Sequence, residues 1–340
     1  MKHVLLAGGY GVVGGLVARR LRATSPKLEI TLAGRNPDHD ATLARELGHA
    51  TTLGMNTSDP ARALDAAGVV DLVVSTVSDT GDLLTLEALR RGIPHLGITR
   101  TPQDIAPLLM AAMSGCTAPL AVFGHWQAGA LTLAALDLCS GLRSVERVWL
   151  SALYDPEDPV GATAKEDSAE FLNVALLREA GLWKTLSGRD SPHAVTPSLF
   201  KSFEGIPMGV LDVPSIAVRT GARDIRFDIG VGVSLGRSRT GLASHDLVVE
   251  LSGTDESGRH VVRERLLTAP RGQAWLTSIM VALAAERLLG LAGKRPLDPG
   301  LYLPETLLSP QTALAKLVSY GVGITDYEER VNSELAQEVG

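Results

Sequence analysis

The sequence begins with a short apolar segment, residues 3–7, that runs directly into Gly8-Gly9-Tyr10-Gly11-Val12-Val13-Gly14. An apolar periodic stretch follows, in which Val13, Val17 and Leu21 recur four residues apart. A buried strand, a turn of closely spaced glycines and a helix are the opening elements of a dinucleotide-binding fold. The order of these three signals constrains the fold of the first domain more than any other feature of the chain.

Three of these glycines have separate steric roles in such a turn. Gly9 permits the tight bend from strand to helix, Gly11 lets the backbone approach a diphosphate, and Gly14 lets the helix lie close to the strand. The diphosphate would bind to N–H groups at the start of the helix, where the helix dipole favours negative charge. A glycine-rich turn without a ligand is the alternative interpretation. A phosphate-binding loop of the nucleotide-hydrolase kind is excluded, because Gly15-Leu16 stands where Lys and Ser or Thr would be needed.

The bulk properties of the 340-residue chain exclude several classes of function. The length suggests two domains, and 45% hydrophobic and 21% charged residues are ordinary for a soluble globular protein. A net charge of −6 argues against nucleic-acid and anionic-membrane partners. The two cysteines are too few for a disulfide framework, and no apolar run is long enough to span a membrane. We therefore expect a soluble, cytoplasmic protein that acts on a small molecule.

Strand and helix signals alternate along the first 140 residues. Short apolar runs predict strands at residues 3–7, 29–33, 50–55, 69–75, 95–99 and 120–123. Helices are predicted after the glycine turn, after the cap Asp59-Pro60, and at residues 83–89, 102–113 and 128–138. Because most of these strands lack polar alternation, we expect an α/β fold: a doubly wound Rossmann sheet of parallel strands covered by helices on both faces.

The pattern changes near residue 145. Longer alternating strands are predicted at residues 145–154, 225–235, 247–252 and 261–268, the last two joined by a hairpin turn at 255–258. We expect a half-exposed antiparallel or mixed sheet, one helix at 166–180, a loop-rich stretch at 187–214 and a buried apolar helix at 273–291. The predicted domains are residues 1–142 (Rossmann), 143–270 (α+β, for substrate binding and dimerisation) and 271–340 (C-terminal helices returning to the Rossmann domain).

The end of the second predicted strand bears on the choice of cofactor. An NAD-binding fold typically places Asp or Glu there to bind the ribose 2′-hydroxyl, but this chain has Gly34 followed by Arg35. A guanidinium suits a 2′-phosphate, so the sequence favours NADP(H) over NAD(H); Arg35 as a solvated loop residue is the alternative. The residues predicted to bind the cofactor are Gly9, Tyr10, Gly11, Val12, Val13, Gly14, Gly34, Arg35, Asn36, Ser75, Thr76, Val77 and Thr99.

Candidate catalytic residues follow the predicted strands. His125, after the sixth strand, is a candidate proton donor because the ordinary pKa of histidine is near neutral, although a structural role is the alternative. Lys165 and Tyr154 are further candidates, and Lys165 is equally consistent with a plain helix start. Arg219, Arg223 and Arg226 could hold an anionic substrate or could line a solvated strand face. No metal-ligand motif, serine-hydrolase motif or Tyr/Lys pair of short-chain dehydrogenases occurs in the sequence.

With these residues identified, the chain resembles the saccharopine dehydrogenase/reductase-like superfamily. The similar segments are Gly8-Gly9-Tyr10-Gly11-Val12-Val13-Gly14, Leu32-Ala33-Gly34-Arg35-Asn36, Val73-Val74-Ser75-Thr76-Val77 and the late helix after Gly272-Gln273-Ala274. The resemblance implies a Rossmann domain built from both ends of the chain, a central α+β domain and a homodimer. It further implies hydride transfer between NADP(H) or NAD(H) and a carbon–nitrogen bond of an amino-acid-like substrate.

The chain departs from that superfamily at two points. Relatives commonly carry Asp where this chain has Gly97, and a Gly-x-x-Pro-Gly turn where it has Gly124-His125-Trp126-Gln127-Ala128-Gly129. Both departures lie where the active site is expected, so they permit a different substrate. We therefore predict an NADPH-dependent reductase of an imine or iminium in a small molecule, amino-acid-like or of specialised metabolism. The alternatives are a non-catalytic NADP-binding sensor or scaffold and a reductase of C=C or C=O bonds.

Overall fold

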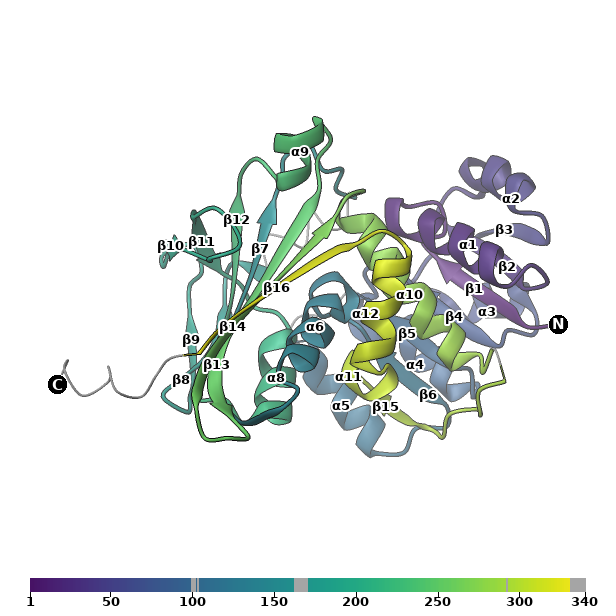
Figure 1. Ribbon diagram of the computed structural model, residues 1–340. Coiled ribbons are helices and arrows are strands. Elements are labelled where there is room, and N and C mark those ends of the chain that lie inside the picture. Colours follow the sequence, from purple (N-terminus) through teal and green to yellow (C-terminus); the bar gives the residue numbers. More distant parts are fainter. Residues whose placement is uncertain (99–101, 103, 162–170, 292, 331–340) are drawn as a thin grey trace, which may run out of the picture. The chain divides into compact units, whose positions relative to one another are not determined.

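The computed structural model describes residues 1–98, 102, 104–161, 171–291 and 293–330, which form two compact units (Figure 1). Of these residues, unit 1 contains 1–128, 160–161 and 274–308, and unit 2 contains 129–159, 171–273 and 309–330. Each unit is therefore built from stretches that are far apart in the sequence. We predicted that residues 271–340 return to the first domain. In the structure, residues 274–308 belong to unit 1, and the described residues after 308 belong to unit 2.

Unit 1 contains a parallel sheet of seven strands in the order β15-β6-β5-β4-β1-β2-β3. The strands are β1 His3–Ala7, β2 Glu29–Gly34, β3 Ala50–Gly54, β4 Leu72–Ser75, β5 His95–Gly97, β6 Pro119–Val122 and β15 Gly300–Tyr302. All six strands predicted in this region are present. The predicted doubly wound α/β fold is therefore confirmed, with β15 as an added edge strand.

The helices of unit 1 connect these strands and cover both faces of the sheet, as Figure 1 shows. They are α1 Val12–Thr24, α2 Ala41–Leu47, α3 Pro60–Ala67, α4 Leu83–Arg90, α5 Ile105–Met113, α10 Gln273–Leu288 and α11 Pro304–Leu307, with short 3-10 turns η1 Pro37–Asp40, η2 Thr80–Asp82 and η3 Trp126–Gly129. The predicted cap is confirmed, because the Asp59 carboxylate accepts a hydrogen bond from the Arg62 N–H (3.4 Å) at the start of α3.

Burial on both faces of the sheet explains why its central strands β1 and β4 lack polar alternation. Leu5 lies in a cluster with Leu64 of α3 and Leu84 of α4, whereas Val4 and Leu6 point to the opposite face and are also fully buried. Side chains of α1 and α10 meet as well: the Arg20 guanidinium donates to the Ser278 hydroxyl (2.7 Å) and lies over the Trp275 ring. Among the described residues, none of the helices combines the length and apolar character needed to cross a membrane.

Unit 2 is organised around a nine-stranded mixed sheet. Its main path runs β10-β11-β12-β7-β13-β14-β16, and a hairpin of β8 and β9 joins the side of β12. The strands are β7 Leu142–Tyr154, β8 Ala175–Glu179, β9 Leu182–Leu186, β10 His193–Val195, β11 Phe203–Pro207, β12 Asp224–Val231, β13 His245–Asp255, β14 His260–Ala269 and β16 Gly323–Arg330. The helices are α6 Ala130–Leu138, α8 Asp212–Thr220, α9 Leu235–Thr240 and α12 Pro310–Ser319.

Pairing in this sheet confirms the predicted mixed character. β12 is parallel to β7, whereas β13 is antiparallel to β7 and to β14. The predicted hairpin turn joins β13 and β14, and Gly258 adopts the positive φ of 85° that the turn requires.

The prediction of a half-exposed sheet is wrong for β13. Eight of its eleven residues are buried, and helices α6 and α8 contact one face of the sheet. On the other face, the buried Glu264 carboxylate accepts hydrogen bonds from the Ser198 N–H (2.6 Å) and the Leu199 N–H (2.5 Å). The loop that contains Ser198 is thereby held against the sheet, and Leu199 and Phe203 pack against its apolar cluster.

The predicted helix at residues 166–180 is wrong in its second half. Ala175–Glu179 is strand β8, which turns through Ala180 and Gly181 at positive φ (49° and 85°) into β9. The segment is rich in helix-forming residues, but pairing with a neighbouring strand overrides that weak local preference. Residues 166–170 lie outside the described residues.

Candidate cofactor and active site

The carboxyl ends of the parallel strands in unit 1 form one edge, and the predicted cofactor residues lie along it. The register pairs Ala7 of β1 with Ser75 of β4, Ser75 with Gly97 of β5, and Gly97 with Val122 of β6. Strand order reverses between β1 and β4, so the loops that follow these two strands flank the switch point of the sheet. Ligands of open α/β sheets bind in the crevice at such a point.

The glycine turn after β1 leaves no space for a side chain at Gly8, Gly9 or Gly14. A Cβ at Gly14 would lie 2.1 Å from the Gly8 carbonyl oxygen, and a Cβ at Gly9 would lie 2.9 Å from Leu32 Cα. Gly8 has a φ of +79°, and a Cβ there would meet Thr76 and Val77 at 2.6 Å. The close approach of helix α1 to strand β1 therefore depends on Gly14, in keeping with the role assigned to it from the sequence.

Thr76 and Ser75 hold this edge together. The Thr76 hydroxyl donates to the carbonyl oxygens of Ala7 (3.0 Å) and Gly8 (3.3 Å), and the Ser75 hydroxyl donates to the Val77 carbonyl (3.1 Å). The prediction placed Ser75, Thr76 and Val77 beside a cofactor. In the structure the Thr76 hydroxyl supports the backbone of the glycine turn and the Ser75 hydroxyl supports its own loop, positioning roles that the sequence analysis missed.

Tyr10 packs across the end of β2. Its ring occupies the space beside Gly34, where a Cβ would lie 2.1 Å from Tyr10 Cε1. The Tyr10 hydroxyl accepts a hydrogen bond from the Asn36 N–H (3.2 Å), while Arg35 and Asn36 are exposed. Gly34 is therefore required by the Tyr10 ring as well as by any ligand, and the Arg35 guanidinium remains accessible beside the turn.

The start of α1 has the features that an anion needs. Gly11 is the N-cap residue, no side chain caps the helix, and its first turn contains no acidic residue. Gly11 and Val12 are exposed. The Gly11 N–H donates to the Gly8 carbonyl oxygen (2.9 Å), so the N–H groups of Val12 and Val13, together with the helix dipole, are those that would favour a negatively charged group here. This edge of unit 1 could thus hold a dinucleotide, with its diphosphate at Gly11–Val13 and its adenosine end near Arg35.

His125 follows β6 but is not exposed at this edge. Its side chain is fully buried, with Nε2 3.9 Å from the buried Glu305 carboxylate of α11. Burial lowers the pKa of His125 to about 3. The imidazole is therefore neutral near pH 7 in this conformation, and it can offer a hydrogen bond but not the proton of an imidazolium.

The turn after His125 is strained. Gln127 and Ala128 have positive φ values of 52° and 51°, and Gly129 continues with 88°. Residues other than glycine rarely adopt this backbone conformation, and those that do cluster at functional sites. The Gln127 side chain accepts a hydrogen bond from the Thr277 hydroxyl of α10, which helps to hold the turn. This turn replaces the Gly-x-x-Pro-Gly turn expected from the resemblance.

Tyr154 lies in unit 2, at the end of β7, beside two buried carboxylates. Burial, together with the charges of Asp158 and Asp155, raises the pKa of Tyr154. Burial raises the pKa of Asp155 too, but the Ser234 N–H (2.8 Å), the Glu157 N–H (3.0 Å) and Arg237 outweigh it, so that pKa is lowered overall. The sequence analysis missed this acidic pair, although the Asp-x-x-Asp spacing after a strand is itself a turn signal.

Asp158 is the more strongly perturbed member of the pair. Its carboxylate accepts a hydrogen bond from the Gln273 N–H (2.8 Å) at the start of α10. A Cβ at Gly272 would lie 2.0 Å from Asp158 Oδ1, so glycine is needed there. Burial and the nearby Asp155 charge raise the pKa of Asp158 to about 6. Thr99 and Lys165, the remaining predicted site residues, lie outside the described residues.

The pKa of Asp158 predicts how stability varies with pH. This pKa is about 6 in the folded protein and 3.8 for an ordinary Asp. Between these two pH values the folded state retains a proton that the unfolded chain has lost. The free energy of unfolding should therefore fall as pH rises from about 4 to about 6. We expect Asp158→Asn to remove most of this fall and to exceed the wild type in stability above the window. Urea denaturation across the pH range measures the free energy of unfolding of both proteins.

The control is Asp190→Asn, which removes an exposed carboxylate of the same unit. This variant should keep the pH dependence of the wild type. An Asp158→Asn protein with an unchanged pH profile would contradict the assignment.

Comparisons with known proteins were made for sequence and for structure. No protein-family model and no curated sequence matches the chain. Among solved structures, the fold is similar to saccharopine dehydrogenase (L-Glu forming) from Saccharomyces cerevisiae, with a TM-score of 0.67, 14% identity and coverage of 97% of this chain and 100% of that one. The WlbA dehydrogenase from Chromobacterium violaceum, determined with NADH and UDP-GlcNAcA, has a TM-score of 0.49 and 10% identity, with coverage of 98% and 96%. At the level of the fold, the resemblance to saccharopine dehydrogenase is confirmed.

Proposed function

We propose that the protein is an NADPH-dependent reductase that transfers hydride to the C=N bond of an imine or iminium in a small molecule. The observation that carries the proposal is the tightly packed glycine turn at Gly8–Gly14, placed at the switch point of a doubly wound sheet with the start of α1 exposed. A saccharopine-dehydrogenase fold supports the same class of reaction by analogy alone.

The proposed cofactor residues are those of the carboxyl edge of unit 1. Backbone N–H groups at Val12 and Val13 would hold the diphosphate, beside Gly11, and Arg35 would bind the 2′-phosphate of the adenosine ribose. NADPH, when bound, supplies a hydride. Ser75, Thr76 and Val77 would form the backbone wall beside the nicotinamide, with the two hydroxyls already engaged in holding that wall.

The two kinds of acceptor differ in their need for a proton. Reduction of a C=O bond needs a proton at oxygen when hydride reaches carbon, whereas an iminium accepts hydride alone and gives an amine. Burial lowers the pKa of His125, so we do not assign this side chain the delivery of a proton as an imidazolium. Lys165 and Tyr154 remain proposed proton-handling residues of the substrate side. A reductase of C=C or C=O bonds and a non-catalytic NADP-binding protein are the alternatives.

Direct assay tests the proposed reaction. The pure protein with NADPH and a panel of cyclic imines should consume NADPH, seen as loss of the nicotinamide absorbance, and should transfer deuterium from deuterated NADPH to the imine carbon. Turnover only with enones or keto acids would replace C=N by C=C or C=O. Tight NADPH binding without turnover on the whole panel would favour the non-catalytic alternative.

A pair of neighbouring glycines tests the cofactor site. Gly14→Ala places a Cβ 2.1 Å from the Gly8 carbonyl oxygen and should abolish NADPH binding by displacing α1. Gly15→Ala is the matched control, since its Cβ would make ordinary contacts of 3.6 Å or more and should stabilise the helix by about 0.5–1 kcal/mol. Calorimetric titration with NADPH and thermal melting measure both effects. Equal NADPH affinity in the two variants would rule out a diphosphate at this turn.

Arg35 tests the preference for NADPH. Arg35→Ala should weaken NADPH binding by about tenfold or more, because a charge-assisted contact to phosphate is lost, and should leave NADH binding nearly unchanged. Arg45→Ala, at an exposed arginine of α2, is the control. A parallel loss of affinity for both nucleotides would show that Arg35 does not recognise the 2′-phosphate.

A further inference from the structure

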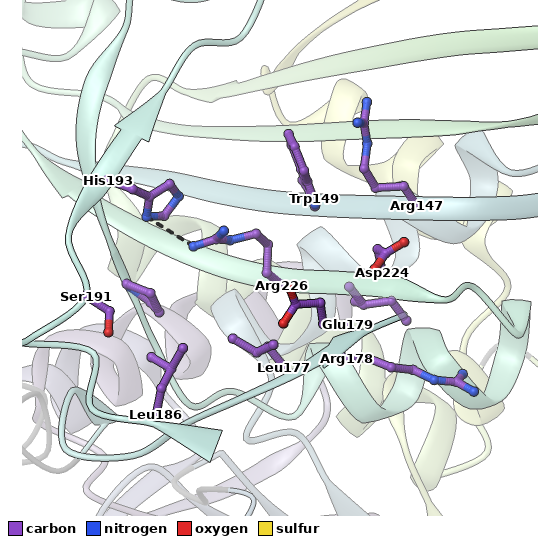
Figure 2. A pocket seen from close by; sticks show the side chains of 12 residues that line it. Arg147, Trp149, Leu177, Arg178, Glu179, Leu186, Ser191, His193, Asp224 and Arg226 are labelled. Atoms are coloured by element: carbon purple, nitrogen blue, oxygen red, sulfur yellow. Dashed lines mark hydrogen bonds between the residues drawn. The ribbon is translucent and has the colours of Figure 1, made fainter. Parts of the chain in front are cut away.

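A pocket lies entirely in unit 2, and its lining contains none of the residues predicted to bind the cofactor or to act in catalysis. Its volume is about 540 Å³, within the range of small-molecule pockets. Figure 2 shows side chains of β7, of β12 and of the β8–β9 hairpin around it, together with His193 of β10. The chemistry of this lining is unusual, because arginines and a tryptophan lie next to apolar side chains.

The first part of the lining is a stack of Arg147 on Trp149. Both residues belong to β7 and, being two positions apart, lie on the same face of the sheet. The Arg147 guanidinium carbon is 4.1 Å from the centre of the Trp149 ring. Its Nε is buried and has no hydrogen-bond partner among the described residues. A guanidinium held in this way presents a planar set of donors to an acceptor oxygen.

The second part is a rigid group around Arg226. This residue is opposite Trp149 in the parallel pairing of β12 and β7. Its guanidinium donates to both Asp228 carboxylate oxygens (2.7 and 3.0 Å) and to His193 Nδ1 (3.0 Å), the contact drawn in Figure 2. Because His193 Nδ1 accepts from Arg226, the ring proton belongs on Nε2, 3.4 Å from Asp228. The Arg226 side chain is thus held in place through Nε and Nη2, and Nη1 has no hydrogen-bond partner in the part of the chain that the structure describes.

Most of the acidic side chains around this pocket already have a partner within the protein. Glu179 pairs with Lys184, and Asp224 accepts the Ala180 N–H (2.8 Å). Glu250 of β13 is opposite Trp149; burial raises the pKa of Glu250, and the charge of Arg147 partly opposes this. The third arginine of the lining, Arg178, donates to the Gly181 carbonyl. Glu179 and Asp224 line the pocket even though each has a partner, so a single negative charge is better matched here than a double one.

We propose that this pocket binds a small monocarboxylate with a planar apolar body, such as an aromatic acid. The carboxylate lies between the guanidinium groups of Arg147 and Arg226, and the apolar body lies against Trp149 and the side chains of Leu177 and Leu186. A phosphate monoester is the wrong ligand, because its second negative charge disfavours it. Arg226, which the sequence left open as an anion-binding residue, has this role without any part in the proposed hydride transfer.

Binding of 2-naphthoate tests the proposal. Calorimetric titration of the full-length protein, together with tryptophan fluorescence, should show saturable binding of 2-naphthoate and little binding of neutral 2-naphthamide or inorganic phosphate. Arg147→Gln removes the charge but keeps a polar side chain of similar reach, and should weaken 2-naphthoate at least about tenfold. Arg219→Gln, at an exposed arginine of α8, is the matched control and should bind as the wild type does.

Two more variants keep the test decisive should Arg147→Gln fold poorly. Arg147→Lys keeps the charge without the planar fork and should weaken binding by a smaller factor. Arg226→Gln combined with Asp228→Asn removes both charges of the buried pair, so no lone carboxylate is left, and should also lower affinity. The proposal is overturned if 2-naphthoate does not bind saturably, if 2-naphthamide binds equally well, or if folded Arg147 variants bind as tightly as the wild type.

Discussion

The close approach of helix α1 to the Gly8 carbonyl oxygen is the contact on which the site in unit 1 depends. It requires hydrogen at Gly14 Cα in place of a side chain, and the Thr76 hydroxyl fixes the same turn from the neighbouring strand through Ala7 and Gly8. Together these contacts bring the start of α1 to the switch point between β1 and β4. Electrostatics then follows from geometry: exposed N–H groups at a helix start, with no acid in the first turn, create a place for negative charge.

The fold of unit 1 was predictable because its information is local. Each strand is a short apolar run, and each is followed within a few residues by a helix signal. This alternating order of strands and helices predicts a doubly wound parallel sheet. Unit 2 was less predictable, because its pairing joins distant segments. The parallel pairing of β7 with β12 has no local signal, and Ala175–Glu179 reads as a helix until its partner β9 is known. Burial of β13 likewise depends on a loop that Glu264 holds against it.

The site was predictable where it depends on backbone and less so where it depends on burial. The glycines and Arg35 follow from spacing alone. The neutral state of His125 does not, because it arises from enclosure by residues that include Glu305, far along the chain. The same holds for Asp158, whose raised pKa reflects its contact with Gln273 and Gly272 and the neighbouring Asp155. Charges in a folded protein are tuned by tertiary neighbours, and a sequence names the titratable groups without naming those neighbours.

The position of β15 has a consequence for how the protein is made. This strand, Gly300–Tyr302, pairs with β6, Pro119–Val122, which is synthesised much earlier. During translation the nascent Rossmann sheet therefore displays β6 as an open edge while most of unit 2 emerges from the ribosome. Three residues near the C-terminal end cap that edge. Truncated or stalled chains that end before residue 300 would keep it uncovered, exposed to chaperones and to pairing with other nascent chains.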